Sequence, residues 1–278
     1  MRWQFFLPFF AVVLTAASPP SVQAVPQAQP VIPNGDSGKL VTPTIRMGDG
    51  TISGSRLRPF QVAWSATFYP DNAPPIVATG MWLQSLALED WNGRKVFVRA
   101  TGGLLYSHSS HEIRGYVAHI AVLDSKTLAP IWSEHRDADG STEKWVVNGT
   151  HVEWHHKAGD PAAKEEVETF DTPVPAYDLA GAIIPFYLRA LPLKLGYSGV
   201  IPVVGDPQHP MRGLPFKVVR REPIHAGPLG TIDAWVVECP DPTAGTLHFW
   251  MSEKVPYPLK MEVPATSGSP RQTYDLAG

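Results

Sequence analysis

Short runs of β-branched and aromatic residues, separated by turn residues, recur along the chain from about residue 60 onward. Runs of this kind are typical of β-strands, because branched and aromatic side chains pack well on a pleated surface. The pattern predicts strands at 61–69, 81–91, 95–100, 115–123, 144–147, 150–155, 216–220, 231–238, 246–251 and 259–263.

Two of the predicted connections specify how neighbouring strands pair. Asn92-Gly93 and Asn148-Gly149 each supply the two positive-φ positions of a type I′ hairpin turn. Strands joined by such short turns are antiparallel. Some strands alternate polar and apolar residues, whereas 115–123 and 231–238 are apolar on nearly both faces. This mixture predicts a mainly β fold: a curved antiparallel meander, either a half-barrel or an open barrel.

One segment, 177–193, carries a helical pattern of apolar residues. Asp178 is placed to cap its start, and Pro185 is expected to kink or split it. The apolar stripe has helical spacing and is expected to pack on, or plug, the concave face of the sheet; it consists of Leu179, Ile183, Phe186 and Ala190.

The N-terminal region has the pattern of a targeting segment followed by a loose leader. Residues 1–24 have the order of a secretory signal peptide: Arg2, an apolar stretch and a small-residue cleavage pattern. The apolar stretch of about 13 residues is shorter than the roughly 20 that span a bilayer. Residues 25–46 are rich in proline and predict a flexible leader, which leaves 47–278 as a single β-rich domain. We therefore expect export, most simply to a periplasm, and no integral membrane segment after signal cleavage.

Composition narrows the function classes. The single cysteine excludes an intramolecular disulfide framework and a thiolate metal site. A formal net charge of −3 without basic runs argues against nucleic-acid binding, which needs clustered Lys and Arg. We identify no cofactor-binding motif and no catalytic residues.

Two groups of polar residues are candidates for chemistry. His151, Glu153 and His155 alternate along one predicted strand, so all three face one side and are a candidate metal site; a solvated polar face accounts for the same alternation. The acidic run from Glu165 to Asp171 is interpreted as a solvated turn rather than a paired acid/base site.

The C-terminal half resembles DUF3108, a family of exported bacterial proteins of unknown function. The residues that carry the resemblance are Asp178-Leu179, Tyr187-Leu188-Arg189, Leu191-Pro192-Leu193, Gly196, Arg221-Glu222, Gly230, Trp250-Met251-Ser252, Pro258 and Lys260. Where such proteins often have an aspartate after the Trp-x-Ser element, this chain has Glu253 and Lys254. The resemblance implies a curved antiparallel sheet, similar to the half-barrels of periplasmic lipoprotein carriers, and implies no catalytic residues.

These observations leave three hypotheses for function. The first is an exported, non-enzymatic protein that binds a lipid or another apolar ligand in its curved sheet, with Tyr187, Arg189, Trp235 and Trp250 as ligand-binding residues. Arg189 and Tyr187 would then meet the ligand head group; the alternative is that Arg189 pairs with Glu222 or Asp178 and fastens the helix to the sheet. The second hypothesis is a cell-envelope interaction or scaffold module with a filled core. The third is a metal-dependent enzyme that uses His151, Glu153 and His155.

Overall fold

The structure is a computed structural model that describes residues 44–69, 74–106, 113–178, 183–241, 245–265 and 271–277. The predicted signal peptide, 1–24, and nearly all of the predicted leader, 25–46, lie outside these residues. At the end of that leader, Ile45 is buried and its N–H donates to the carbonyl of Val200 at 2.9 Å. The packed domain therefore includes residues that precede Met47.

The described chain forms a 14-stranded antiparallel sheet with one short α-helix and two 3₁₀ turns. The order across the sheet is β8-β7-β6-β5-β4-β3-β2-β1-β14-β13-β12-β11-β10-β9, so most neighbours are consecutive hairpins. The strands are β1 (Phe60–Tyr69), β2 (Ile76–Trp91), β3 (Arg94–Tyr106), β4 (Ile113–Asp124), β5 (Pro130–Arg136), β6 (Thr142–Asn148), β7 (His151–Lys157), β8 (Glu166–Asp171), β9 (Ser198–Val204), β10 (Met211–His225), β11 (Thr231–Asp241), β12 (Gly245–Met251), β13 (Lys260–Val263) and β14 (Arg271–Leu276). The predicted antiparallel meander is confirmed.

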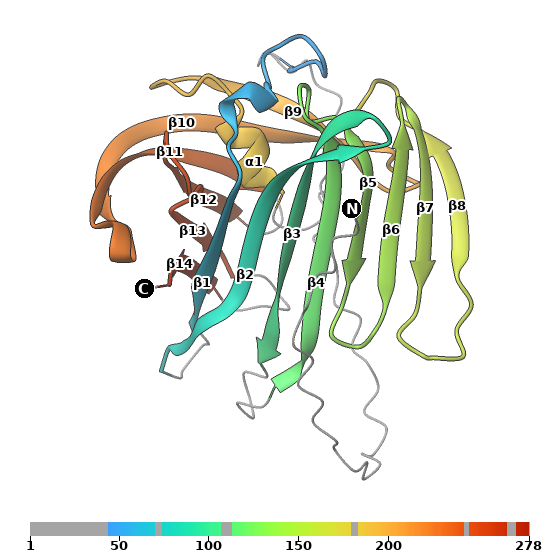
Figure 1. Cartoon of the computed structure of the whole chain (residues 1–278), viewed down its shortest axis with the longest axis horizontal. Coiled ribbons are helices and arrows are strands. Elements are labelled where there is room, and N and C mark those ends of the chain that lie inside the picture. The colour runs from blue at the N-terminus through green and yellow to red at the C-terminus, as the bar shows by residue number, and fades with distance from the viewer. Residues whose placement is uncertain are drawn as a thin grey trace.

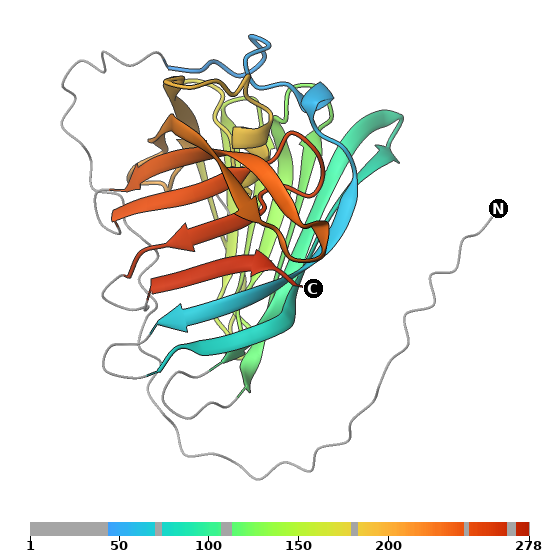
Figure 2. The same cartoon turned by 90° about the vertical axis from the view of Figure 1, so that its left-hand side faces the viewer.

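The sheet curves strongly around helix α1 (Ile184–Arg189), which lies inside the curve (Figure 1). In the side view, the orange and red C-terminal strands cross in front of the green N-terminal strands (Figure 2). The sheet does not close, because β8 and β9 are its two ends. Backbone bonds cover part of the β9 edge: the N–H of Tyr177 donates to Pro202 and the N–H of Val204 donates to Tyr177. The fold is an open barrel, one of the two predicted forms.

Each strand predicted from the sequence is present, and the structure adds β5, β8, β9 and β14. Strand β8 corrects the interpretation of the acidic run as a turn. Its carboxylates are exposed, as expected, but its backbone pairs in register with β7, from His151 opposite Asp171 to His156 opposite Glu166. Solvated side chains along an edge strand produce the same sequence pattern as a solvated turn.

The helix is shorter than the predicted range 177–193. It begins at Ile184, with Pro185 in its first turn, where the missing N–H costs no hydrogen bond. Pro185 therefore starts the helix rather than kinking it. Asp178 does not cap it, since the N-cap residue is Ile183 and forms no side-chain cap bond.

The helix and the concave face of the sheet enclose the main hydrophobic core. Phe186, Tyr187 and Leu188 are fully buried there, and the Phe60 ring lies 6.0 Å from Phe186 and 5.2 Å from Tyr257. A second cluster combines residues of β1, β11, β12 and β14 with residues of two connections, and its buried residues are Trp64, Ala226, Ala234, Val236, Trp250, Leu259 and Leu276. The prediction that the helix packs into the concavity is confirmed.

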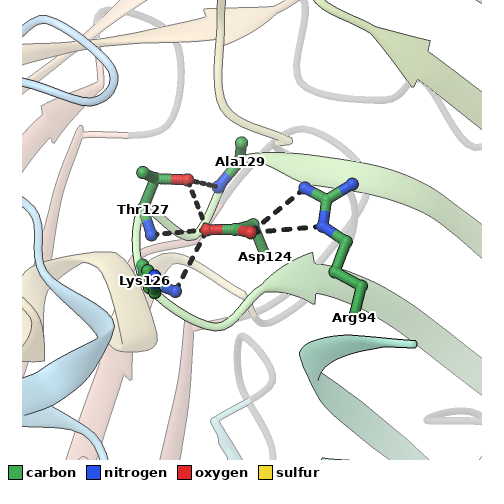
Figure 3. A network of polar contacts seen from close by, with 5 residues as sticks. All are labelled: Arg94, Asp124, Lys126, Thr127 and Ala129. Atoms are coloured by element: carbon green, nitrogen blue, oxygen red, sulfur yellow. Dashed lines mark hydrogen bonds and ion pairs between the residues drawn. The ribbon is translucent and has the colours of Figure 1, made fainter. Parts of the chain in front are cut away.

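A tight turn between β4 and β5 is organised by one carboxylate (Figure 3). Oδ1 of Asp124 accepts hydrogen bonds from the N–H groups of Lys126 and Thr127 and from the Thr127 hydroxyl, at 2.8–3.0 Å. Oδ2 accepts from the guanidinium of Arg94 at 3.1 and 3.2 Å. Partial burial alone would raise the pKa of Asp124, but these bonds, first among them that from the Thr127 backbone, lower it below its ordinary value.

This turn supports the 3₁₀ turn η1 (Gly54–Arg56). The N–H of Gly54 donates to the carbonyl of Lys126 at 2.8 Å, and a Cβ at Gly54 would lie 2.0 Å from the carbonyl oxygen of Ser125. Only glycine fits so close to the turn. The Asp124 turn thereby fixes the position of Arg56.

We predict that Asp124→Ala lowers the free energy of unfolding by about 1–3 kcal/mol, because it leaves turn N–H groups without a charged acceptor. A carboxyl with a depressed pKa stabilises the fold above its unfolded-state pKa and loses that effect as pH falls. The difference between variant and wild type should therefore shrink as pH is lowered through the ordinary value of 3.8.

Denaturant unfolding at neutral and acidic pH measures this effect. The control is Asp90→Ala, which breaks an ion pair with Lys95 whose two side chains are both largely exposed and which should cost at most about 1 kcal/mol. Equal losses for the two variants at neutral pH would contradict the role of Asp124.

Candidate functional site

An open pocket of about 640 Å³ lies beside the C-terminal end of α1. Its walls come from η1 and the residues after it, the segment that follows α1, strand β11 and the loop after β12, regions that are far apart in the sequence. The lining residues are Arg56, Arg58, Arg189, Leu191, Pro192, Leu193, Lys194, Trp235, Ser252 and Glu253. We call this the rim pocket. Its volume is in the range of small-molecule sites.

Three arginines of the rim pocket are held by backbone carbonyls. Arg56 donates to the carbonyls of Thr51 and Ala190, at 3.0 and 2.7 Å. Arg58 donates to Ser55 and Leu57, and Arg189 donates to the carbonyl of Glu253 at 2.7 Å. None of the ion pairs between described residues includes any of these three arginines. Their positive charge is therefore oriented but not neutralised by direct contact.

The pKa of Arg189 is affected by the other positive charges of the pocket. Burial is the largest effect and lowers the pKa of Arg189, and the positive charges of Arg56 and Arg58 lower it further. Tyr257 and the carboxylate of Glu253 act in the opposite direction. Three cations that repel one another within one pocket favour the binding of an anion.

Tyr257 connects the arginines to the core. Its hydroxyl accepts a hydrogen bond from the N–H of Arg58 at 2.5 Å and donates to the carbonyl of Arg58 at 3.1 Å. The guanidinium of Arg189 lies 5.4 Å from the centre of the same ring, within cation–π range. Tyr257 is only 1% exposed, so it is a rigid support for both arginines.

The rest of the pocket lining combines apolar residues with Lys194, Ser252 and Glu253. Leu191, Pro192 and Leu193 follow the helix, and Trp235 on β11 contacts a further cation, since the guanidinium of Arg221 is 5.1 Å from the Trp235 ring. Arg221 also forms a 3.8 Å ion pair with Glu253. The pocket thus combines a cationic side with an apolar side.

The four ligand-binding residues proposed from the sequence do not lie together. Arg189 and Trp235 line the rim pocket. Tyr187 is fully buried beneath it, where its hydroxyl accepts a hydrogen bond from the N–H of Asp178. Trp250 belongs to the second cluster; its indole N–H donates to Glu222 at 2.7 Å, and Lys260 lies 4.7 Å from its ring.

The alternative partner Glu222 proposed for Arg189 is engaged elsewhere. Glu222 pairs instead with Arg220, which is on the same strand, at 2.8 Å. Arg56 and Arg58, which the sequence pattern did not single out, lie in η1 and the irregular segment between it and β1. Neither belongs to a motif, and only the folded chain brings them beside Arg189.

The candidate metal site is spread along β7. His151 faces Asp171 at 3.2 Å, whereas His155 lies 3.6 Å from both Glu153 and Glu165. Within the part of the chain that the structure describes, no group of three or more His, Cys, Asp or Glu side chains is arranged to hold a metal ion. The described helices also include none that is long and apolar enough to span a membrane.

These features define a class of protein: an open antiparallel β-barrel with a helix in its concavity and a cationic pocket at the rim. The chain belongs to the family described as "Protein of unknown function (DUF3108)", whose sequence profile matches residues 98–275. The match begins within β3, so it includes strands that lie well before the first family motif residue, Asp178.

The fold is also similar to a solved structure, the β-barrel-like protein of domain of unknown function DUF1849 from Brucella abortus. The identity is 9%, the TM-score is 0.44, and the alignment covers 80% of this chain and 97% of that one. No curated protein matches the sequence.

We predict that Tyr257→Phe lowers the free energy of unfolding by about 1–3 kcal/mol, because the N–H and carbonyl of Arg58 lose their shared partner. Chemical denaturation measures the change. The control is Tyr116→Phe, since Tyr116 is 55% exposed and loss of its hydroxyl should change stability by about 0.5 kcal/mol or less. A Tyr257→Phe protein as stable as the control would contradict this support role.

Proposed function

We propose that this protein is a non-enzymatic binding protein that takes the phosphate head group of an amphiphilic ligand in its rim pocket. The observation that carries the proposal is the cluster of Arg56, Arg58 and Arg189. Backbone carbonyls hold these side chains in place, and their positive charges repel one another. A bound phosphate supplies the missing negative charge. Guanidinium groups suit this role because their planar donors match phosphate oxygens.

The apolar side of the pocket supports a ligand with an apolar body. Leu191, Leu193 and Trp235 line the same space as the arginines. An alkyl chain that packs against them is removed from water. This burial favours binding by about 25 cal/mol for each Å² of apolar area removed from water. The head group provides orientation and the chain provides affinity.

We place this activity outside the cytoplasm, most simply in a periplasm. The support is the order of charged, apolar and small residues in 1–24. In that compartment, phosphate-bearing amphiphiles are present as membrane lipids and their products.

The proposal predicts that dodecyl phosphate, below its critical micelle concentration, binds the mature protein and that dodecyl maltoside binds much more weakly. Titration calorimetry measures affinity, and a change in tryptophan fluorescence reports binding independently. Arg58→Gln and Arg189→Gln should each weaken dodecyl phosphate binding about tenfold, because each removes one charge-assisted contact. Added salt should weaken binding as well.

The matched control is Lys217→Gln, which makes the same charge change at an exposed position on β10. It should bind dodecyl phosphate like the wild type. Equal affinity for the phosphate and the maltoside, or equal weakening by all three substitutions, would overturn the head-group assignment. Absence of binding to either amphiphile would favour the alternative of an envelope scaffold with a filled core.

A further inference from the structure

A row of polar side chains crosses the concave face of the sheet away from the rim pocket. Gln84 on β2 pairs in register with Thr101 on β3, Thr101 with His119 on β4, and His119 with His135 on β5. Residues paired in this way point to the same face. Gln84 and His119 are 3% and 2% exposed, so these two members of the row are buried rather than solvated.

Arg99 lies in the adjacent row on the same face. It pairs with Leu86 and Ala121, both of which belong to the main core, and it is fully buried. One of its terminal nitrogens, Nη1, contacts Nδ1 of His119. Ser133 on β5 is paired with Ala121 on the side away from Arg99, and it is 1% exposed. Arg99, His119 and Ser133 therefore come together from three neighbouring strands.

Several polar atoms in this group have no hydrogen-bond partner among the described residues. They are Nε and Nη2 of Arg99, Nε2 of His119 and Oγ of Ser133, and all are buried. Nδ1 of His119 accepts from Arg99, so the proton of the neutral ring is on Nε2, which is then a donor. Burial, reinforced by the positive charge of Arg99, lowers the pKa of His119 well below its ordinary value and keeps this ring neutral.

The guanidinium nevertheless stays charged. Burial lowers the pKa of Arg99 to about 9, against the opposing effects of Asp178 and Tyr187, so at neutral pH Arg99 is protonated. A buried charge and a buried unpaired donor are each costly. The carboxylate of Asp178 acts on Arg99 electrostatically, but the open positions on Arg99 and His119 are donors, so an acceptor group such as a carboxylate would satisfy them.

We propose that Arg99, His119 and Ser133 form a second, interior site that binds a carboxylate. The two oxygens of a carboxylate match two nitrogens of one guanidinium, Nε and Nη2, in a bidentate pair. His119 Nε2 and Ser133 Oγ are the further donors. This site shares no residue with the rim pocket, so it does not depend on the function proposed for that pocket.

Aromatic side chains next to the site favour a carboxylate at the end of an apolar chain. The indole N–H of Trp64 donates to Gln84 at 2.9 Å, and Trp82 packs with the clusters that contain Trp64 and Phe68. This apolar surface continues from the polar row towards β1 and β14, where the Tyr274 ring is 6.4 Å from that of Trp82. A fatty acid therefore fits better than a free anion.

The experiment compares dodecanoate, acetate, inorganic phosphate and dodecanol as ligands of the mature protein. Titration calorimetry measures binding, and the shift of the unfolding temperature reports it independently, since a ligand that binds only the folded state stabilises it. We expect dodecanoate to bind and dodecanol to bind at least about tenfold more weakly, because dodecanol lacks the charge. Binding of acetate or phosphate in place of dodecanoate would assign the site to a free anion and overturn the fatty-acid occupant.

Variants test whether the interior site is responsible. Arg99→Met should abolish dodecanoate binding, because it removes the guanidinium and keeps a side chain of similar length. Ser133→Ala is a milder change that should weaken binding about fivefold. It keeps the test decisive if Arg99→Met does not fold.

Two control variants show whether a loss of binding is specific to the interior site. Ser85→Ala lies on the opposite face of β2, next to Ala100, and should bind dodecanoate like the wild type. Lys217→Gln, at an exposed position on β10, should also retain dodecanoate binding. Unchanged dodecanoate binding in Ser133→Ala and Arg99→Met, or no binding in the wild type, would overturn the interior site.

Discussion

The curvature of one long antiparallel sheet creates a concave face that must be filled, and the rest of the structure depends on how it is filled. Helix α1 supplies the apolar groups, because Phe186, Tyr187 and Leu188 are all fully buried. The strands share a single concave face, so the main core extends from β2 to β13 around this short helix. The sheet stays open between its end strands β8 and β9, where Val152 on β7 and Val204 on β9 pack with Ala176 of the segment after β8.

Filling the concavity in this way also determines where the charges lie. Arg189 follows the buried positions of the helix and is only half-buried, and it comes within reach of the loop after β12. The Asp124 turn positions η1, and η1 carries Arg56 to the carbonyl of Ala190 at the end of the helix. The rim pocket is therefore a consequence of core packing, and its arginines converge because three separate segments meet at one helix end.

The sequence was a good guide wherever a local pattern determines structure. Alternation and the Asn92-Gly93 turn, where both residues have positive φ, predicted the antiparallel meander, and the apolar spacing around Phe186 predicted the helix in the concavity. The type I′ turn predicted at Asn148-Gly149 is wrong: only Gly149 has positive φ, because Asn148 is paired with His151 and the turn residues are Gly149 and Thr150. Strands such as β8 were missed because an edge strand with exposed carboxylates has the composition of a loop. Of the residues proposed from the sequence to bind a ligand, Arg189 and Trp235 line the rim pocket. Arg56 and Arg58 line it too but were not predicted, since no periodicity marks residues that are brought together only by tertiary contact.

The position of Arg99 in the interior could not be predicted from the sequence for a similar reason. In strand β3 it shares a face with Lys95, Phe97 and Thr101, so its position has the pattern of a solvated face. The strand register shows that this face is buried, because the neighbours of Arg99 across the sheet are Leu86 and Ala121 of the main core. An arginine at the rim is stabilised by water and by carbonyls, whereas Arg99 is shielded from water and contacts a neutral histidine. The unpaired donors of Arg99 and His119 are the basis of the proposed interior carboxylate site, and they distinguish this interior from a core that is only packed.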